Sequence, residues 1–169
     1  ACTYDMEGKY VLPGFTDMHI HLSLSGGDTL IDNAKSAVQQ AYDAVKFAQD
    51  SLMAGFTTMR DVGSCDNVAI ELRNAIDAGK IVGPNIIASG KIITPTENGN
   101  DFFAGLYTEA DGEQEIRKAV REEMKKGADF IKIMGTGAVM NPGGTPGQPI
   151  YTYEELKAVV EAAKFKDTY

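Results

Sequence analysis

The amino-acid sequence predicts an α/β fold: a parallel sheet built from four successive βα units. Four short segments of strand-like composition alternate with four segments of helical periodicity along the 169 residues. Alternation of this kind implies parallel strands joined by right-handed crossovers. An open doubly wound sheet and a (β/α)8 barrel both fit this pattern. Because a complete barrel takes about 250 residues, this chain would form half of one.

The predicted strands are short, rich in β-branched residues and bounded by turn signals such as Pro13-Gly14. Each is followed by a helix of the type expected for a βα unit. The four strands are expected at residues 15–22 (FTDMHIHL), 56–62 (FTTMRDV), 85–90 (NIIASG) and 128–134 (ADFIKIM).

The helices are predicted from apolar residues spaced three and four apart, with capping residues at their ends. The first is expected over residues 32–53 with Asp32 as N-cap, and the second runs through residues 69–76. The third begins with a capping box of Asp111 and Gln114, and the fourth with one of Thr152 and Glu155. Two loops are expected, a polar one at residues 91–110 and a Gly/Pro-rich one at 135–149. The latter is interpreted either as a mobile active-site loop or as a simple connector.

The composition describes an acidic globular chain. Apolar residues make up 43%, charged residues 24%, and the net charge is −8, with a pI of about 4.7. The sequence has no basic patch for nucleic acid, and its acidic balance disfavours anionic membrane surfaces. No apolar run approaches the roughly 20 residues that span a bilayer, and no secretory signal is evident. Cys2 and Cys65 lack metal-site spacing, so we expect free thiols and a cytoplasmic location.

The only two histidines, His19 and His21, lie two residues apart in the first predicted strand. Side chains at this spacing point to the same side of a strand, while Met18 and Ile20 face the other side. Parallel α/β folds place their ligand sites at the carboxyl ends of strands. Two imidazoles in such a position suit a divalent ion such as zinc, although a chance His-x-His pair in a buried strand is the simpler alternative.

Lys132 is unusual because it lies in the middle of the fourth predicted strand. Burial there would lower the pKa of its amine, whereas a lysine at a sheet edge would extend its ammonium into solvent. A neutral amine can react with carbon dioxide to give a carbamate, whose oxygens can bind metal. Lys132 is therefore a possible third ligand beside the histidines. The Gly135-x-Gly137 segment lacks the third glycine and the helix of a dinucleotide site.

Four segments together resemble the amidohydrolase superfamily, especially its imidazolonepropionase-like and prolidase-like branch. They read VLPGFTDMHIHL, AGFTTMRDVG, GPNIIASGKIITPT and GADFIKIMGTGAVM. Members of this family are metal-dependent hydrolases of amide bonds. In them the first strand of a TIM barrel ends in His-x-His and the fourth carries a carboxylated lysine. The resemblance implies that His19, His21 and Lys132 are metal ligands, with zinc as the expected ion.

Other parts of the family pattern are missing from this sequence. The family takes two further histidines from its fifth and sixth strands and an aspartate from the eighth, and no catalytic residue is assigned here. Where relatives often carry Gly-His-Gly after the third strand, this chain reads TPTENGND. We therefore expect residues 1–169 to form one partial TIM-barrel domain, the N-terminal half of the barrel. Residues 1–12 would be a remnant of a flanking β-sandwich strand.

Two functions follow from this resemblance. The first is a metal-dependent hydrolase that cleaves C–N bonds of a small-molecule amide or peptide, such as a dipeptide or N-acyl amino acid, by metal-activated water. The isolated chain would then be inactive or weak. The second is a non-catalytic half-barrel, either a fragment or a truncated product. An open half-barrel exposes strand edges and apolar faces, so we expect a homo-oligomer in which two halves pair.

Overall fold

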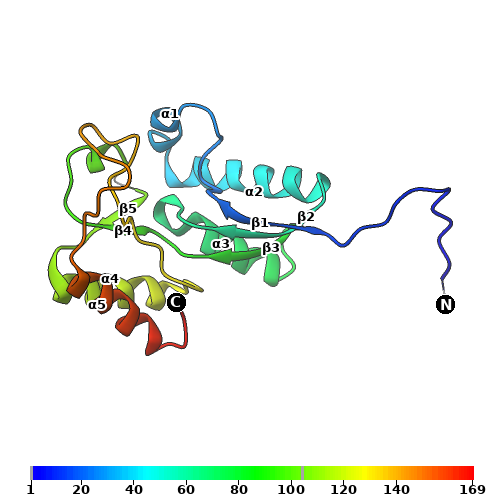
Figure 1. Ribbon diagram of the computed structural model, residues 1–169. Helices are drawn as coiled ribbons and strands as arrows, with labels where there is room; N and C mark the ends of the chain where they lie inside the picture. Colours follow the sequence, from blue (N-terminus) through cyan, green and yellow to red (C-terminus); the bar gives the residue numbers. More distant parts are fainter. Residues whose placement is uncertain (1, 104) are drawn as a thin grey trace.

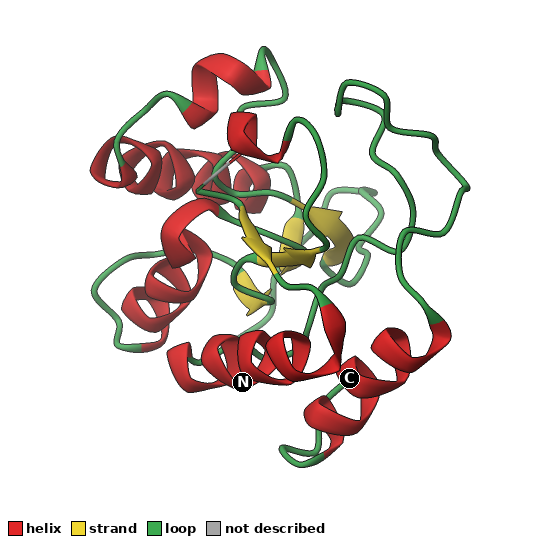
Figure 2. Ribbon diagram, turned by 90° about the vertical axis from the view of Figure 1, so that its left-hand side faces the viewer, coloured by secondary structure: helices red, strands yellow, loops and turns green. Residues whose placement is uncertain are grey.

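The computed structural model describes residues 2–103 and 105–169. Its central sheet contains three parallel strands in the order β1 (Phe15–Ile20), β2 (Phe56–Asp61) and β3 (Asn85–Ala88). A smaller parallel sheet pairs β4 (Ile92–Thr94) with β5 (Tyr107–Glu109). The helices lie in an arc around one side of the strands (Figures 1 and 2). The predicted α/β class with parallel strands is confirmed.

In the described residues the helices are α1 (Thr29–Asn33), α2 (Ala37–Met53), α3 (Val68–Asp77), α4 (Gly112–Lys126) and α5 (Tyr153–Lys164), with 3-10 turns η1 (Cys65–Asn67) and η2 (Asn100–Phe103). Helices connect β1 to β2 and β2 to β3 as predicted, but in the described residues β3, β4 and β5 follow one another without an α-helix, and no strand separates α4 from α5. The single helix predicted over residues 32–53 is wrong at its start. The capping box that begins α2 is formed by Ser36 and Gln39, whereas Asp32 is buried and accepts hydrogen bonds from Ser25 and Lys35.

The capping predictions for the last two helices had different outcomes. Thr152 and Glu155 form the predicted capping box of α5. At α4 the prediction is wrong, because Asp111 makes no side-chain bond to the helix. Its carboxylate instead accepts hydrogen bonds from the backbone nitrogen and the hydroxyl of Thr96. Asp111 therefore ties the start of α4 to the segment after β4.

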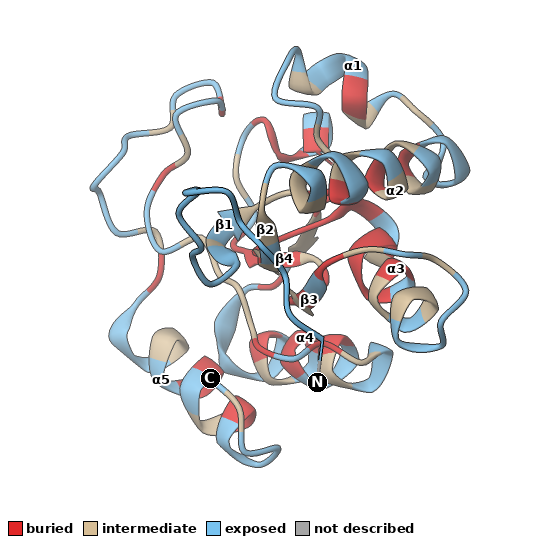
Figure 3. Cartoon of the chain, turned by 90° about the vertical axis from the view of Figure 1, so that its right-hand side faces the viewer, coloured by how far each residue is buried: buried red, intermediate tan, exposed pale blue. Residues whose placement is uncertain are grey.

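The described residues contain three apolar clusters, two of which pack the longer helices against the strands. The buried residues gather between helices and strands (Figure 3). The first packs α2 and α3 against the central sheet, with Ala48, Met59 and Ile70 among its buried members. The second joins α4 and α5 to β4, where Ile93 is fully buried. Burial of apolar surface at this density provides the main stabilisation of the fold. It also fixes the strand ends that carry the candidate site.

Residues 128–134, predicted as the fourth strand, are extended but form no continuous strand. At one end Asp129 N donates to Ala88 O of β3 (2.8 Å), whereas further along Ile93 N of β4 donates to Lys132 O (2.9 Å). An isolated parallel bridge to β4 is the only ladder contact in the described residues. The segment changes partner from β3 to β4 halfway along its length. Neither partner therefore gives it a ladder long enough to be a strand, and this prediction is wrong.

The end of the chain lies along the other side of this segment. Ile131 N donates to Tyr169 O (2.7 Å), and Thr168 Oγ1 donates to Asp129 O (2.5 Å). The rings of Phe130 and Tyr169 stack with centroids 5.6 Å apart. Residues 128–134 are therefore enclosed by β3 and β4 on one side and by the last two residues on the other.

The prediction of a polar loop over residues 91–110 is also wrong, because this segment contains β4, η2 and β5. At the N-terminus, residues 2–14 lie in no helix or strand and extend away from the body (Figure 1). Their interpretation as a β-sandwich remnant stays a prediction.

Cys2 is exposed and Cys65 buried, and both are free thiols as expected. In the described residues no helix combines the length and apolar character that crossing a membrane requires.

Candidate metal centre

The two histidines lie at the carboxyl end of β1 and face the same cleft. Their ring centroids are 5.5 Å apart with an interplanar angle of 74°, and both rings line the cleft. The shared face predicted from strand periodicity is confirmed. The opposite face is only half as expected: Ile20 packs against the first core, whereas Met18 remains 55% exposed.

The ring of His21 is oriented by a backbone carbonyl. Its Nδ1 lies 2.8 Å from Gly63 O. A carbonyl oxygen only accepts hydrogen bonds, so Nδ1 must carry the proton in this contact. The lone pair of the neutral ring is then on Nε2, which is the arrangement that metal-ligating histidines commonly use. The hydrogen bond therefore fixes the ring of His21 and leaves Nε2 free for a metal ion without any change of conformation.

Asp61, at the end of β2, holds the turn that supplies this carbonyl. It is fully buried and accepts hydrogen bonds from Leu22 N (2.7 Å), Gly63 N (3.0 Å) and Ser64 Oγ (2.6 Å). These bonds connect the residue after His21 to the turn after β2. Burial raises the pKa of Asp61, against the opposing effect of these hydrogen bonds and of the charge of His21. No pattern in the sequence indicated this role, although Asp61 lies within the AGFTTMRDVG segment.

Gly63 is required in this turn for two reasons. Its φ is +146°, a region that residues with a Cβ rarely occupy. A Cβ placed there would also lie 2.4 Å from Cγ1 of Ile92, which is far inside van der Waals contact. The glycine thus allows β4 to approach the turn closely while its carbonyl faces His21.

Lys132 reaches the same cleft from the extended segment beside β4. Its backbone oxygen accepts from Ile93 N (2.9 Å), which fixes the residue against the second core. Partial burial lowers the pKa of the Lys132 amine, and the positive charge of Arg60 lowers it further. Arg60 itself is held by a cation–π contact, with its guanidinium carbon 3.7 Å from the centroid of Phe130.

His19 lies closest to solvent of the three residues. Its pKa is below the ordinary value because its ring is partly desolvated, and the charges of Lys132, His21 and Arg60 act in the same direction. Asp17 has the opposite, smaller effect. An imidazole with a lowered pKa is neutral at pH 7 and has a lone pair available for a metal ion. This electrostatic environment therefore favours the neutral form of His19, which can bind a metal ion, over the charged form.

His19 and His21 line one cleft of about 520 Å³ together with Lys132, which is remote from them in sequence. Within the described parts of the chain, no group of three or more His, Cys, Asp or Glu side chains is placed to hold a metal ion. The candidate ligand set therefore depends on Lys132 as the third member. Two imidazole nitrogens with a carbamate oxygen on Lys132 match the donors preferred by zinc and similar ions. Their ligand roles remain a prediction.

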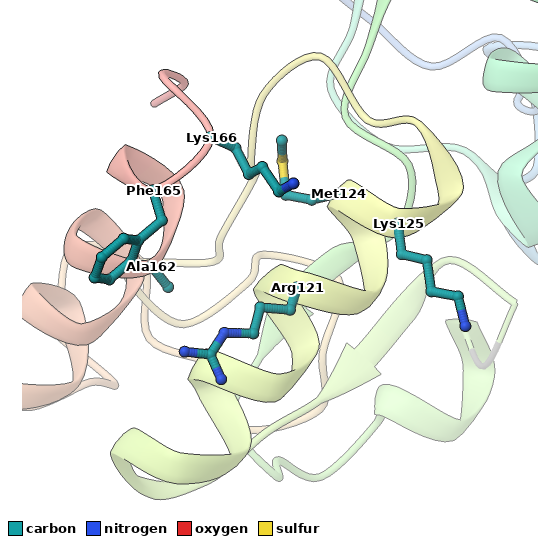
Figure 4. A pocket seen from close by; sticks show the side chains of 6 residues that line it. All are labelled: Arg121, Met124, Lys125, Ala162, Phe165 and Lys166. Carbon is teal, nitrogen blue, oxygen red and sulfur yellow. The ribbon is translucent and has the colours of Figure 1, made fainter.

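A separate pocket of about 470 Å³ lies between α4 and α5 (Figure 4). Its lining combines apolar and basic side chains: Met124, Ala162, Phe165, Arg121, Lys125 and Lys166. No carboxylate or imidazole is among these six residues. This pocket therefore offers no metal-ligand set, and the cleft at β1 is the candidate functional site.

Comparison with known proteins shows which sequences and solved structures this chain resembles. The sequence profile described as the amidohydrolase family matches residues 10–169. Ochratoxinase from Aspergillus niger is 31% identical over 180 residues, covering 90% of this chain and 36% of its own length. A crystal structure of an amidohydrolase superposes with a TM-score of 0.88 at 30% identity, covering 100% of this chain and 45% of the other.

A second solved structure is a Xaa-Pro dipeptidase with methionine bound in its active site. It is 36% identical to this chain with a TM-score of 0.77, and the match covers 93% of this chain and 42% of the other. A prolidase complexed with N-methylphosphonate-L-proline is 30% identical with a TM-score of 0.80, over 93% of this chain and 41% of the other. The chain thus spans less than half the length of these relatives.

Proposed function

Because this chain belongs to the amidohydrolase family, we propose that it is half of a TIM barrel that supplies His19, His21 and Lys132 to a metal centre for hydrolysis of amide bonds. The observation that carries the proposal is the meeting of these three side chains in one cleft. Carboxylated Lys132 would add an anionic oxygen to the two imidazole nitrogens. This donor set fits a divalent ion such as zinc.

The residues of this chain would hold the metal ion and orient its ligands. A bound divalent ion supplies Lewis-acid polarisation of the amide carbonyl and of a water nucleophile. His21 is kept in the required tautomer by Gly63 O, and Asp61 keeps Gly63 in place. Partial burial lowers the pKa of Lys132, which favours the neutral amine, the form that reacts with carbon dioxide.

The names of the relatives favour a small amide or peptide as substrate. One relative is an ochratoxinase, one a Xaa-Pro dipeptidase and one a prolidase. We infer that this chain takes part in cleaving the C–N bond of a dipeptide or an N-acyl amino acid. The chain spans about 40% of these solved structures, and we infer that catalysis also requires the remaining part of the barrel.

A second candidate is a non-catalytic half-barrel that associates with a copy of itself. The observation in its favour is the edge strand β1, which pairs with β2 alone in the described sheet. Phe15 is 50% exposed and Met18 55% exposed on this strand. Unpaired backbone groups and apolar side chains at a sheet edge promote association.

Zinc binding tests the proposed ligands directly. Metal-free protein would be titrated with zinc in bicarbonate buffer, using wild type, His19→Ala and Lys132→Ala, with exposed Lys80→Ala as the matched lysine control. We expect wild type and Lys80→Ala to bind with equal affinity and the other two variants to lose about ten-fold or more, since each lacks a direct ligand. Equal zinc binding by wild type and His19→Ala would exclude the ligand role.

Hydrolysis separates the two candidate functions. Turnover of dipeptides or N-acyl amino acids by the zinc-loaded chain, abolished in His19→Ala, would contradict the non-catalytic interpretation. Zinc binding without turnover, together with a concentration-dependent dimer, would support the self-associating half-barrel.

A further inference from the structure

Part of the cleft lining is apolar and partly aromatic, and we call it the aromatic wall. It is formed by β4, β5 and the turn before β5, the region for which the sequence predicted only a polar loop. Phe103 and Leu106 are each 4% exposed, and Tyr107 is half-buried. The rings of Phe103 and Tyr107 lie 5.6 Å apart at 51°. All three residues line the same cleft as His19, His21 and Lys132.

The Gly/Pro-rich loop at residues 135–149 extends this wall. Val139 and Met140 line the cleft although they are 83% and 57% exposed. Polar contacts hold the loop beside η2: Asn141 Nδ2 donates to Asn100 Oδ1 (3.0 Å), and Asn98 Nδ2 donates to Pro142 O (3.3 Å). Apolar side chains fixed in an exposed position at a cleft are typical of ligand-binding grooves.

The charge of the cleft is also one-sided. Among the described residues that line it, Lys132 and the two histidines are the titratable groups besides the Tyr107 phenol, and no carboxylate is present. Such a lining has no counter-charge for a cationic group. A volume of about 520 Å³ lies within the 300–1,000 Å³ typical of small-molecule sites. The cleft thus suits a neutral or anionic ligand with a large apolar group.

We propose that this aromatic wall is an apolar subsite that selects amides carrying an aromatic or bulky aliphatic group beside the scissile bond, with Tyr107 as a specificity-determining residue. The proposal rests on the proposed amide-hydrolase function of the same cleft. Tyr107 packs against the buried cluster that contains Phe103 and Leu106, and Val139 and Met140 line the same cleft. A ring seated against Tyr107 is desolvated on one face and lies near the metal ligands.

Binding to the zinc-free chain tests the subsite without requiring hydrolysis. Three acids share one amide and one carboxylate: N-acetylglycine, N-benzoylglycine with a ring on the acyl side, and N-acetylphenylalanine with a ring on the amine side. We expect at least one aromatic compound to bind about five-fold more tightly than N-acetylglycine, the effect of one aromatic contact. Tyr107→Ala should abolish this preference, Tyr107→Phe should retain it, and exposed Tyr42→Ala should not change it.

A second variant keeps the subsite testable if Tyr107→Ala prevents β5 from folding. Val139→Ser lies on an exposed loop outside helices and strands, and it should reduce the aromatic preference by about two-fold. Circular dichroism would verify that each variant is folded. Absence of any aromatic preference, or an unchanged preference in folded Tyr107→Ala and Val139→Ser, would overturn the proposed subsite. A normal aromatic preference in a chain whose zinc affinity is the same in wild type and His19→Ala would contradict the proposed metal centre and leave the subsite supported.

Discussion

Asp61 should be the residue whose loss most damages both stability and the histidine site. Its carboxylate is fully buried and accepts three hydrogen bonds, from Leu22 N, Gly63 N and Ser64 Oγ. Replacement by alanine leaves all three donors without this partner. Replacement by asparagine keeps the shape but turns an NH2 group toward one of the donors. The two substitutions should therefore differ in size and agree in direction.

The contacts give a magnitude for each change. In Asp61→Asn the amide oxygen can still accept from Leu22 N and Ser64 Oγ, so one bond, to Gly63 N, is lost. A single unsatisfied buried donor costs about 1–3 kcal/mol. This loss is partly offset because burial disfavours the charge of Asp61, as its raised pKa indicates, and asparagine carries no charge. We expect Asp61→Asn to lose about 1–2 kcal/mol and Asp61→Ala about 3–5 kcal/mol.

Urea unfolding followed by circular dichroism measures these losses, with exposed Asp77→Asn as the matched control. The control should lie within about 0.5 kcal/mol of wild type. Zinc affinity should fall about ten-fold in Asp61→Asn, because the carbonyl of Gly63 no longer holds His21 as firmly. An Asp61→Ala chain with the urea midpoint of wild type would refute the assigned hydrogen-bond role. Lost stability with unchanged zinc affinity would refute the link to His21.

Two further predictions concern other parts of the chain. Burial opposes ionisation of Asp32, but hydrogen bonds from Lys35 and Ser25 outweigh it and hold the pKa of Asp32 below 3.8. The stability from this carboxylate is present above pH 3.8 and is lost as the pH falls through the folded pKa. Urea midpoints measured against pH should therefore lose this acid-side decrease in Asp32→Asn. The same acid dependence in wild type and Asp32→Asn would contradict the assigned role of Asp32. Met18→Lys places a charge on the edge strand β1 and should shift sedimentation velocity profiles toward monomer, whereas a wild-type chain that is already monomeric would contradict the pairing of half-barrels.

Local patterns in the sequence predicted the elements that depend on local energetics. The period of two placed His19 and His21 on one face of β1, and the structure confirms their shared cleft. Helix α5 begins at its predicted capping box. In these places the side-chain periodicity or cap is set by residues within a few positions of each other. Such interactions can be read from one sequence.

The elements that sequence reasoning missed depend on distant partners. β4 and β5 are three residues each, too short for a period to be visible, and each is stabilised by pairing with the other. Asp61 looked like part of a weak motif because its three donors come from two separate turns. Residues 128–134 carry a strand-like pattern, yet they divide their hydrogen bonds between β3 and β4. No local signal reports how such partners are shared.

β4 links the two halves of the candidate site. Ile93 N donates to Lys132 O, and the adjacent Ile92 N donates to Leu106 O (both 2.9 Å). Ile92 also pairs with Tyr107 in the parallel ladder. The proposed metal ligand and the proposed specificity residue are thus held by neighbouring residues of one buried strand. Because packed interiors deform little, a change that displaces β4 should alter zinc affinity and aromatic preference together, whereas Val139→Ser on the loop should alter the preference alone.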